Sequence, residues 1–263
     1  MPKPIKRLTG SKGVESVLAT LPPHRAGLPA KDTVIGVTRG AGKFTIIHTQ
    51  ELDRYDKGAQ GAGLAVAAVP AAPAGDNYSG TARKAAKLSI STAKTESWKD
   101  LKDLVNSLVP DAKMIAHKPK ISDTAGSGRV KEEERNVHLS AFMYAASREA
   151  DNDFHLIIGR DPQQTPEMYM TMEVSGLPPA ASPGFKQLKA ARDAFKAFFN
   201  KRAGGKLPGL TYDFYHPPVQ VQIDGSLFFD ITHAQGPHPG PPSLKSRMPV
   251  IWEVHPITKI VLK

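Results

Sequence analysis

Polar and hydrophobic positions alternate most clearly in the second half of the chain, where the pattern predicts five strands and one helix. A period of two, rich in β-branched and aromatic residues, is typical of strands with one buried face. Apolar residues at helical spacing follow Ser182 and Pro183, a favourable cap and first helical residue, and Gly204-Gly205 ends this pattern. The expected strands span residues 135–147, 153–160, 168–174, 218–230 and 249–262, with the helix after the third.

Five strands with one helix between the third and the fourth is the order of the OB-fold. That fold is a small Greek-key barrel whose open face and loops bind oligonucleotides or oligosaccharides. The sequence therefore predicts an α+β protein with a C-terminal OB-like five-stranded β-barrel, and a split β-sandwich is the alternative. Asp224-Gly225 interrupts the fourth strand and predicts a bulge there.

The first half has a weaker pattern. Residues 33–38 and 43–49 are β-branched runs around a glycine-containing turn, which predicts a hairpin. The turn is not a nucleotide-binding P-loop, because Phe44 follows Lys43 where that motif needs serine or threonine. Apolar residues at helical spacing from Trp98 to Leu108 predict a helix with Thr95 as its cap.

These patterns divide the chain into four parts. We expect a loosely ordered segment over 1–30, with a helical turn near residues 14–21, and a small basic α+β region over 31–115. Within the latter, residues 58–81 are rich in Ala, Gly and Pro and predict a loop. A polar linker over 116–134 then leads into the barrel domain over 135–263.

Composition narrows the chemistry. Cysteine is absent, which excludes disulfides, thiolate zinc sites and a cysteine nucleophile. No apolar run reaches the roughly 20 residues that a membrane span requires, and no apolar stretch follows the basic N-terminus as in a secretory signal, so a cytoplasmic protein is expected.

The net charge of +10 lies mainly in the first half. Residues 1–135 carry 22 Lys+Arg against 14 Asp+Glu, whereas residues 136–263 carry 13 against 11. Such an excess favours contact with nucleic acid or another polyanion, although solubility alone also explains it.

Three pairs of acidic and histidine residues lie at the ends of the predicted strands. Residues two apart on a strand share a face, so each pair within a strand converges locally. If the second, fourth and fifth strands bring these ends together, the six form one polar cluster. They are Asp153, His155, Asp230, His233, Glu253 and His255.

Two chemistries fit such a cluster. Imidazoles and carboxylates are ligands for zinc or manganese, which activate a bound water, and the metal candidates are His155, His233 and His255. Alternatively a histidine held by a carboxylate acts as a general base without metal. A third interpretation is structural, because such a pair also satisfies half-buried polar groups at strand ends.

Other residues are candidates for ligand binding. Tyr144 and Tyr169 lie in predicted strands and are candidates for stacking on bases, with core packing as the alternative. Lys245 and Arg247 lie in a proline-rich connection between the last two strands, where they are candidates for phosphate contacts.

The phrases DNDFHLII, FFDITHAQG and WEVHPITKI together resemble a group of uncharacterised bacterial proteins. Those proteins carry D-x-D-x-H-L, a phrase like F-F-D-x-x-H-G-Q-x-G, and a closing E-x-H-P-V. This chain has Ala234 in place of glycine, Ile257 in place of valine, and a longer proline-rich insert before the last strand. The resemblance covers about the last half of the chain and implies a shared small β-barrel-like domain, with no assigned reaction. The predicted topology is also similar to that of staphylococcal-type thermonucleases, at the level of the fold.

The hypothesis we place first is a binding module for nucleic acid or another polyanion. The alternative is a metal-assisted hydrolase, a nuclease or phosphoesterase, with the six acidic and histidine residues as its site. A structural or scaffold protein is the third.

Overall fold

The alternating segments of the chain form long strands in the computed structural model, which describes residues 7–8, 27–53, 75–235 and 239–263. The strands are β1 (Arg7–Leu8), β2 (Val34–Arg39), β3 (Thr45–Thr49), β4 (Thr95–Trp98), β5 (Asn136–Arg148), β6 (Phe154–Gly159), β7 (Tyr169–Val174), β8 (Asp213–Phe229) and β9 (Trp252–Leu262). The α-helices are α2 (Lys84–Lys87), α3 (Leu101–Asn106), α4 (Asp111–Ile115) and α5 (Phe185–Arg202). Short 3-10 helices are η1 (Lys31–Thr33), η2 (Lys131–Glu133), η3 (Ile231–Gln235) and η4 (Lys245–Arg247).

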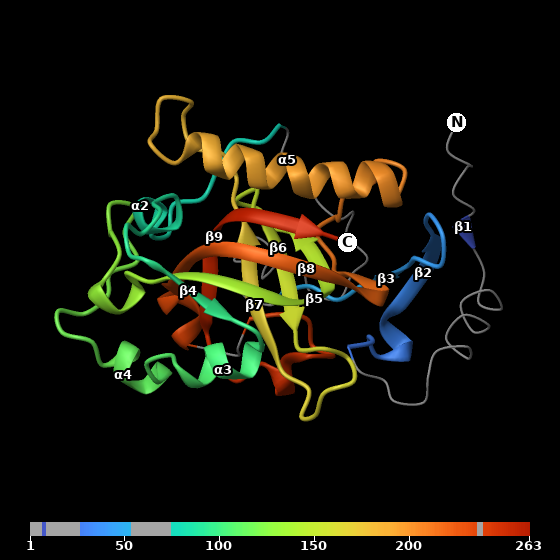
Figure 1. Ribbon diagram of the computed structural model, residues 1–263, viewed down its shortest axis with the longest axis horizontal. Helices are drawn as coiled ribbons and strands as arrows, with labels where there is room; N and C mark the ends of the chain where they lie inside the picture. Colours follow the sequence, from blue (N-terminus) through green and yellow to red (C-terminus); the bar gives the residue numbers. More distant parts are fainter. Residues whose placement is uncertain (1–6, 9–26, 54–74, 236–238) are drawn as a thin grey trace.

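All these strands belong to one sheet, in the order β1-β2-β3-β8-β9-β7-β6-β5-β4. Because β8 also pairs with β5, the strands β5, β6, β7, β9 and β8 pair in a closed ring. Neighbours in this ring are antiparallel except β7 and β9, which are parallel. Figure 1 shows the ring strands at the centre and α5 lying along one side of them. The prediction of a mixed α+β protein is confirmed.

Alternate residues of the ring strands build the main hydrophobic core. Leu139, Leu156, Met172 and Val254 belong to it, each from a different strand. The buried stripe of α5 joins the same core, with Ala191, Phe195, Phe198 and Phe199. The opposite faces of the same strands carry different side chains, because successive residues of a strand point to opposite faces.

The five strands predicted in the second half are confirmed, with two differences in length. Strand β9 begins at Trp252, three residues later than predicted. Strand β8 begins at Asp213, five residues earlier than predicted, because its first part pairs with β3 on one side and with Ala145 and Ala146 of β5 on the other. Pro217 and Pro218 follow His216, the last partner of β3, so they lie where the pairing changes. The predicted bulge is also present, since the β8–β9 register shifts at Asp224/Gly225.

In the first half the hairpin is confirmed and the helix is corrected. Strands β2 and β3 pair antiparallel, and Gly42 in their turn has a φ of +64°, which favours glycine. Thr95 does not cap a helix but begins β4, which pairs parallel with β5. The cap is Asp100, whose Oδ1 accepts a hydrogen bond from the Lys102 amide at 2.9 Å.

Helix α5 begins two residues later than predicted. Ser182 is not its cap and Pro183 is not its first residue, because the amide of Phe185 bonds to the Ser182 carbonyl in a turn that precedes the helix. Gly204 and Gly205 end it with positive φ values, as predicted. No helix in the described ranges combines the length and the apolar character that crossing a bilayer requires.

The predicted division near residue 130 stays a prediction, but the sheet spans it. Strand β4 pairs with β5 and β3 pairs with β8, so both sides supply strands to one sheet. Within the predicted linker, Arg129 donates hydrogen bonds to the carbonyls of Ser89 and His255. The helical turn expected near 14–21 lies outside the described residues, as does the part of the predicted 58–81 loop before residue 75.

Candidate functional site

A row of polar side chains crosses the outer face of β6, β7 and β9. Phe154 and Leu156 of β6 point into the core, so His155 between them points outward. His155 pairs with Glu173 across the antiparallel β6–β7 register. Thr171 pairs with Glu253 in the parallel β7–β9 register. Two residues further along both strands, Glu173 therefore lies beside His255.

Connecting segments cover this row and leave a pocket of about 360 Å³. The segments are the β5–β6 turn, the chain from Tyr78 to Lys87, the end of β3 and the residues that follow β8. The charged residues that line the pocket are Asp53, Lys87, Glu149, Asp151, His155, Glu173, Asp230 and His233. Glu253, His255 and Asp153 are fully buried next to this lining.

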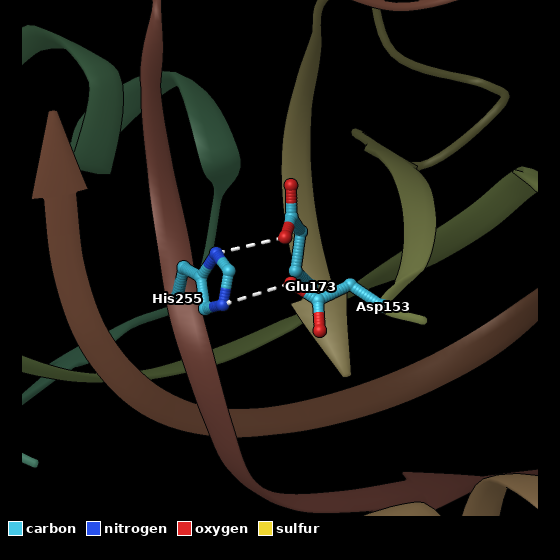
Figure 2. Close-up of side chains that lie close together, drawn as sticks. All are labelled: Asp153, Glu173 and His255. Carbon is cyan, nitrogen blue, oxygen red and sulfur yellow. Dashed lines mark ion pairs between the residues drawn. The ribbon is translucent and has the colours of Figure 1, made fainter. Parts of the chain in front are cut away.

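The imidazole of His255 lies between two carboxylates, as Figure 2 shows. Its Nδ1 is 2.8 Å from Oε2 of Glu173, and its Nε2 is 3.4 Å from Oδ2 of Asp153. The other oxygen of Asp153 accepts a hydrogen bond from the Gly176 amide at 2.5 Å. Burial lowers the pKa of His255, and it raises the pKa of Asp153 well above its usual value together with the charges of nearby carboxylates.

His155 lies on the pocket side of Glu173. Its Nδ1 is 3.0 Å from the Tyr212 hydroxyl and 3.3 Å from Oε1 of Glu149, while its Nε2 is 4.0 Å from Oε1 of Glu173. Burial alone would lower the pKa of His155, but the contact with Glu149 and the charges of Glu173 and Asp53 raise it to about 9.

His233 forms a pair with Asp230 after β8. Its Nδ1 is 3.1 Å from Oδ2 of Asp230, whose other oxygen accepts hydrogen bonds from the amide and hydroxyl of Thr232. Burial opposes ionisation of His233, yet the Asp230 carboxylate raises the pKa of the imidazole. Oε1 of Glu253 is 3.9 Å from the same nitrogen of His233.

Lys87 brings a cation to the wall of the pocket. Its Nζ is 3.6 Å from Oδ2 of Asp151 and 3.9 Å from Oε2 of Glu173. Burial would lower the pKa of Lys87, but Glu173, Asp151 and Asp230 hold it well above its usual value. Glu173 responds in the opposite sense: burial favours its neutral form, but His255 and Lys87 hold its pKa well below the usual value.

Many atoms of this cluster are buried and lack a hydrogen-bond partner in the described structure. They are Oδ2 of Asp153, Nε2 of His155, Oε2 of Glu173, both carboxylate oxygens of Glu253 and both ring nitrogens of His255. Buried polar atoms normally have partners, and a set of unsatisfied ones indicates a water or an ion. Imidazole nitrogens and carboxylate oxygens are ligands of divalent transition metals, so the residues fit a metal site.

The structure brings together all six acidic and histidine candidates, and their role as a site stays a prediction. They fall into three groups whose ligand atoms lie within 4.8 Å of one another: Asp153, Glu173 and His255; His155, Glu173 and Glu253; and Asp230, His233 and Glu253. Sequence reasoning missed Glu173, although a lone acidic residue in the apolar run MYMTMEV was a usable signal. It also missed Lys87, Asp53, Glu149 and Asp151, and nothing in the local pattern of Lys87 sets it apart.

The ligand-binding candidates lie in a separate group that does not line the pocket. Tyr144 and Tyr169 are buried in one hydrophobic cluster with ring centroids 5.0 Å apart, which favours the core alternative, and stacking on bases stays a prediction. Arg247 pairs with Glu167 and lies over the Tyr169 ring, which engages its charge within the protein. Phosphate contact by Lys245 stays a prediction.

Comparisons of the chain with protein-family models, curated proteins and solved structures find no match.

Proposed function

We propose that the protein is a metal-assisted hydrolase of phosphoesters and that the pocket over β6, β7 and β9 is its active site. The observation that carries this proposal is the set of buried histidine and carboxylate atoms without hydrogen-bond partners beside one pocket. Buried ionisable residues in a cleft are common in active sites, and this donor set suits zinc or manganese.

The residues divide into ligands and groups that act on the substrate. Glu173, His255, Asp153, His155 and Glu253 supply ligand atoms. A bound divalent ion supplies a water of lowered pKa and polarises the phosphoryl group.

His233, oriented by Asp230, is placed to act as general base. It takes a proton from the attacking water as the new P–O bond forms, and the bond to the leaving alkoxide breaks as that oxygen takes a proton from solvent water. The ammonium of Lys87 lies on the pocket wall where it can contact a phosphate oxygen.

The substrate class follows from charge and size. An anionic ester suits a protein of net charge +10, and the pocket of about 360 Å³ is near the lower end of ligand-binding pockets. We therefore expect small phosphomonoesters or phosphodiesters.

The test compares metal content and turnover of the full chain. Purified protein loaded with Mn²⁺ or Zn²⁺ is assayed on p-nitrophenyl phosphate and bis-p-nitrophenyl phosphate. We expect turnover that chelation abolishes, loss of both metal and turnover in Glu173→Gln, and loss of turnover with metal retained in His233→Ala.

The matched control is Asp213→Asn, which removes a buried carboxylate 2.6 Å from His48 in a pair outside the pocket. It should retain both metal and activity. A chain that binds neither ion, or that hydrolyses neither ester when loaded, rules the proposal out.

We also propose that the ring of five strands is an OB-like barrel. The proposal is supported by the closed pairing order and by α5 between the third and fourth ring strands. In the OB-fold, ligands bind over the second and third strands between the loops that follow the first and fourth. The polar row occupies that place, because His155 and Glu173 lie on the second and third ring strands while Glu149 and Asp230 follow the first and fourth. An experimental structure in which β5 and β8 are unpaired would refute it.

A nucleic-acid-binding module is the second candidate, supported by the excess of 22 Lys+Arg over 14 Asp+Glu in residues 1–135. A filter-binding assay on single and double strands tests it, and affinity should fall steeply with salt. Binding without hydrolysis would favour this candidate over the hydrolase, and absence of salt-dependent binding would remove it.

A further inference from the structure

Glu173 and Glu253 each lie near two histidines, one beside each carboxylate oxygen. In Glu173, Oε2 lies 2.8 Å from Nδ1 of His255 and Oε1 lies 4.0 Å from Nε2 of His155. In Glu253, Oε2 lies 3.8 Å from Nδ1 of His255 and Oε1 lies 3.9 Å from Nδ1 of His233. The cluster is therefore a chain of alternating imidazoles and carboxylates.

Three of these four separations, 3.8 to 4.0 Å, are too long for a hydrogen bond and leave room for an ion between the atoms. Two ligand atoms that are each about 2.1 Å from a tetrahedral ion lie about 3.4 Å apart. The pair formed by Glu173 and His255 is closer than this, at the distance of a direct contact between an imidazole and a carboxylate.

One ion does not satisfy the cluster. Each ligand group in the described part of the chain contains three residues, so an ion held by Asp153, Glu173 and His255 leaves the buried oxygens of Glu253 unpaired. The group around Asp230 is different, because Asp230 already accepts hydrogen bonds from Thr232. The unsatisfied atoms are concentrated in the two groups that share Glu173.

Charge gives an independent reason. Five carboxylates line the pocket, from Asp53, Glu149, Asp151, Glu173 and Asp230, and those of Asp153 and Glu253 lie beside them, so they outnumber the ammonium of Lys87 and the imidazoles of His155 and His233 in the same lining. Burying such an excess of negative charge is strongly unfavourable unless cations offset it.

We propose that the site holds two divalent metal ions bridged by the carboxylate of Glu173. The inner ion is bound by Asp153, Glu173 and His255, and the outer ion by His155, Glu173 and Glu253. This inference rests on the proposed metal site of the hydrolase. Of the inner ligands only Glu173 lines the pocket, whereas His155 and Glu173 of the outer group both do, so the outer ion is the one that meets substrate.

The first measurement is the metal stoichiometry of the full chain, saturated with Mn²⁺ or Zn²⁺ and freed of excess ion by gel filtration. We expect two ions per chain. The Mn²⁺ protein should give the electron paramagnetic resonance spectrum of a spin-coupled pair, since ions in two-metal sites are about 3.5–4 Å apart.

Three variants locate the ions. Asp153→Asn changes a ligand of the inner group alone and should reduce the stoichiometry from two to one, leaving an uncoupled Mn²⁺ signal. Glu173→Gln should abolish the coupled signal and weaken binding of both ions at least tenfold. Asp213→Asn, outside the site, should keep two coupled ions, and circular dichroism checks that each variant is folded.

The outcomes separate this inference from the proposed function. One ion per chain with an uncoupled signal and retained phosphoesterase activity overturns the bridged pair and leaves the hydrolase intact. Two ions without coupling overturn the Glu173 bridge. No bound ion in the wild-type chain overturns both, and this reading does not depend on how any variant folds.

Discussion

Two groups of buried charges in this protein are satisfied in different ways. Arg83 and Glu133 form a bidentate pair, with Nη1 to Oε1 at 2.6 Å and Nη2 to Oε2 at 2.8 Å. The carbonyls of Phe229 and Gly128 accept further bonds from the guanidinium, and the amides of Val130 and Phe229 donate to the carboxylate. In the pocket cluster, by contrast, neither oxygen of Glu253 has a hydrogen-bond partner in the described structure.

The difference shows that the chain can satisfy a fully buried carboxylate where stability is the only requirement. Glu133 and Glu253 are both 0% exposed, yet one has cationic and amide partners, whereas the other has two histidines at 3.8–3.9 Å and no hydrogen-bond partner in the described structure. A buried polar group without a partner is destabilising, so its presence needs a compensating role. The proposed metal ion would supply that role.

The largest expected effect comes from breaking the satisfied pair. Glu133→Gln leaves the Arg83 guanidinium buried without its counter-charge and should lower the free energy of unfolding by about 3–5 kcal/mol. Denaturant unfolding followed by circular dichroism measures this. A loss below about 1 kcal/mol would mean that burial and bidentate geometry do not distinguish this pair from a surface ion pair.

The next effect is the response of the pocket to metal. Zn²⁺ or Mn²⁺ at one hundred times its dissociation constant should raise the free energy of unfolding by about 2.7 kcal/mol, because the ion binds only the folded chain. Thermal unfolding with and without chelator measures the change. Equal melting temperatures in the two conditions would mean that the pocket cluster binds no metal and is structural, like the Arg83–Glu133 pair.

The strands and most of the site residues could be predicted from the sequence, because polar and apolar residues alternate with a period of two along each strand. His155, Glu253 and His255 were found because they interrupt alternating strands near turn residues. Lys87 and Asp53 were not found, since they reach the pocket from segments that cover the sheet, and no local period encodes such a contact. Thr95 was misassigned as a helix cap because its parallel pairing with β5 is a long-range contact that outweighs local propensity.

A smaller effect of opposite sign is expected from Glu253→Gln in the chelated protein. The substitution removes a carboxylate without hydrogen-bond partners from a site with other buried acids, so unfolding should become less favourable by up to about 1 kcal/mol. The same variant should lose the metal-dependent gain of the wild-type chain. Destabilisation comparable to that of Glu133→Gln would show that Glu253 has an essential partner in the metal-free state, and the contrast between the two charge groups would fail.

The smallest expected change in the free energy of unfolding separates the contribution of burial from that of charge pairing. Lys189 and Asp193 form an ion pair one turn apart on α5, 2.5 Å long, but their side chains are 49% and 54% exposed. Water screens such a pair, so Asp193→Ala should change the free energy of unfolding by only about 0.3–0.5 kcal/mol, measured in the same denaturant titration. If this loss approached that of Glu133→Gln, pairing alone would set the energy of ion pairs here. A small loss instead assigns the difference to burial, which also makes the Glu253 carboxylate costly, since it is buried without a hydrogen-bond partner in the described structure.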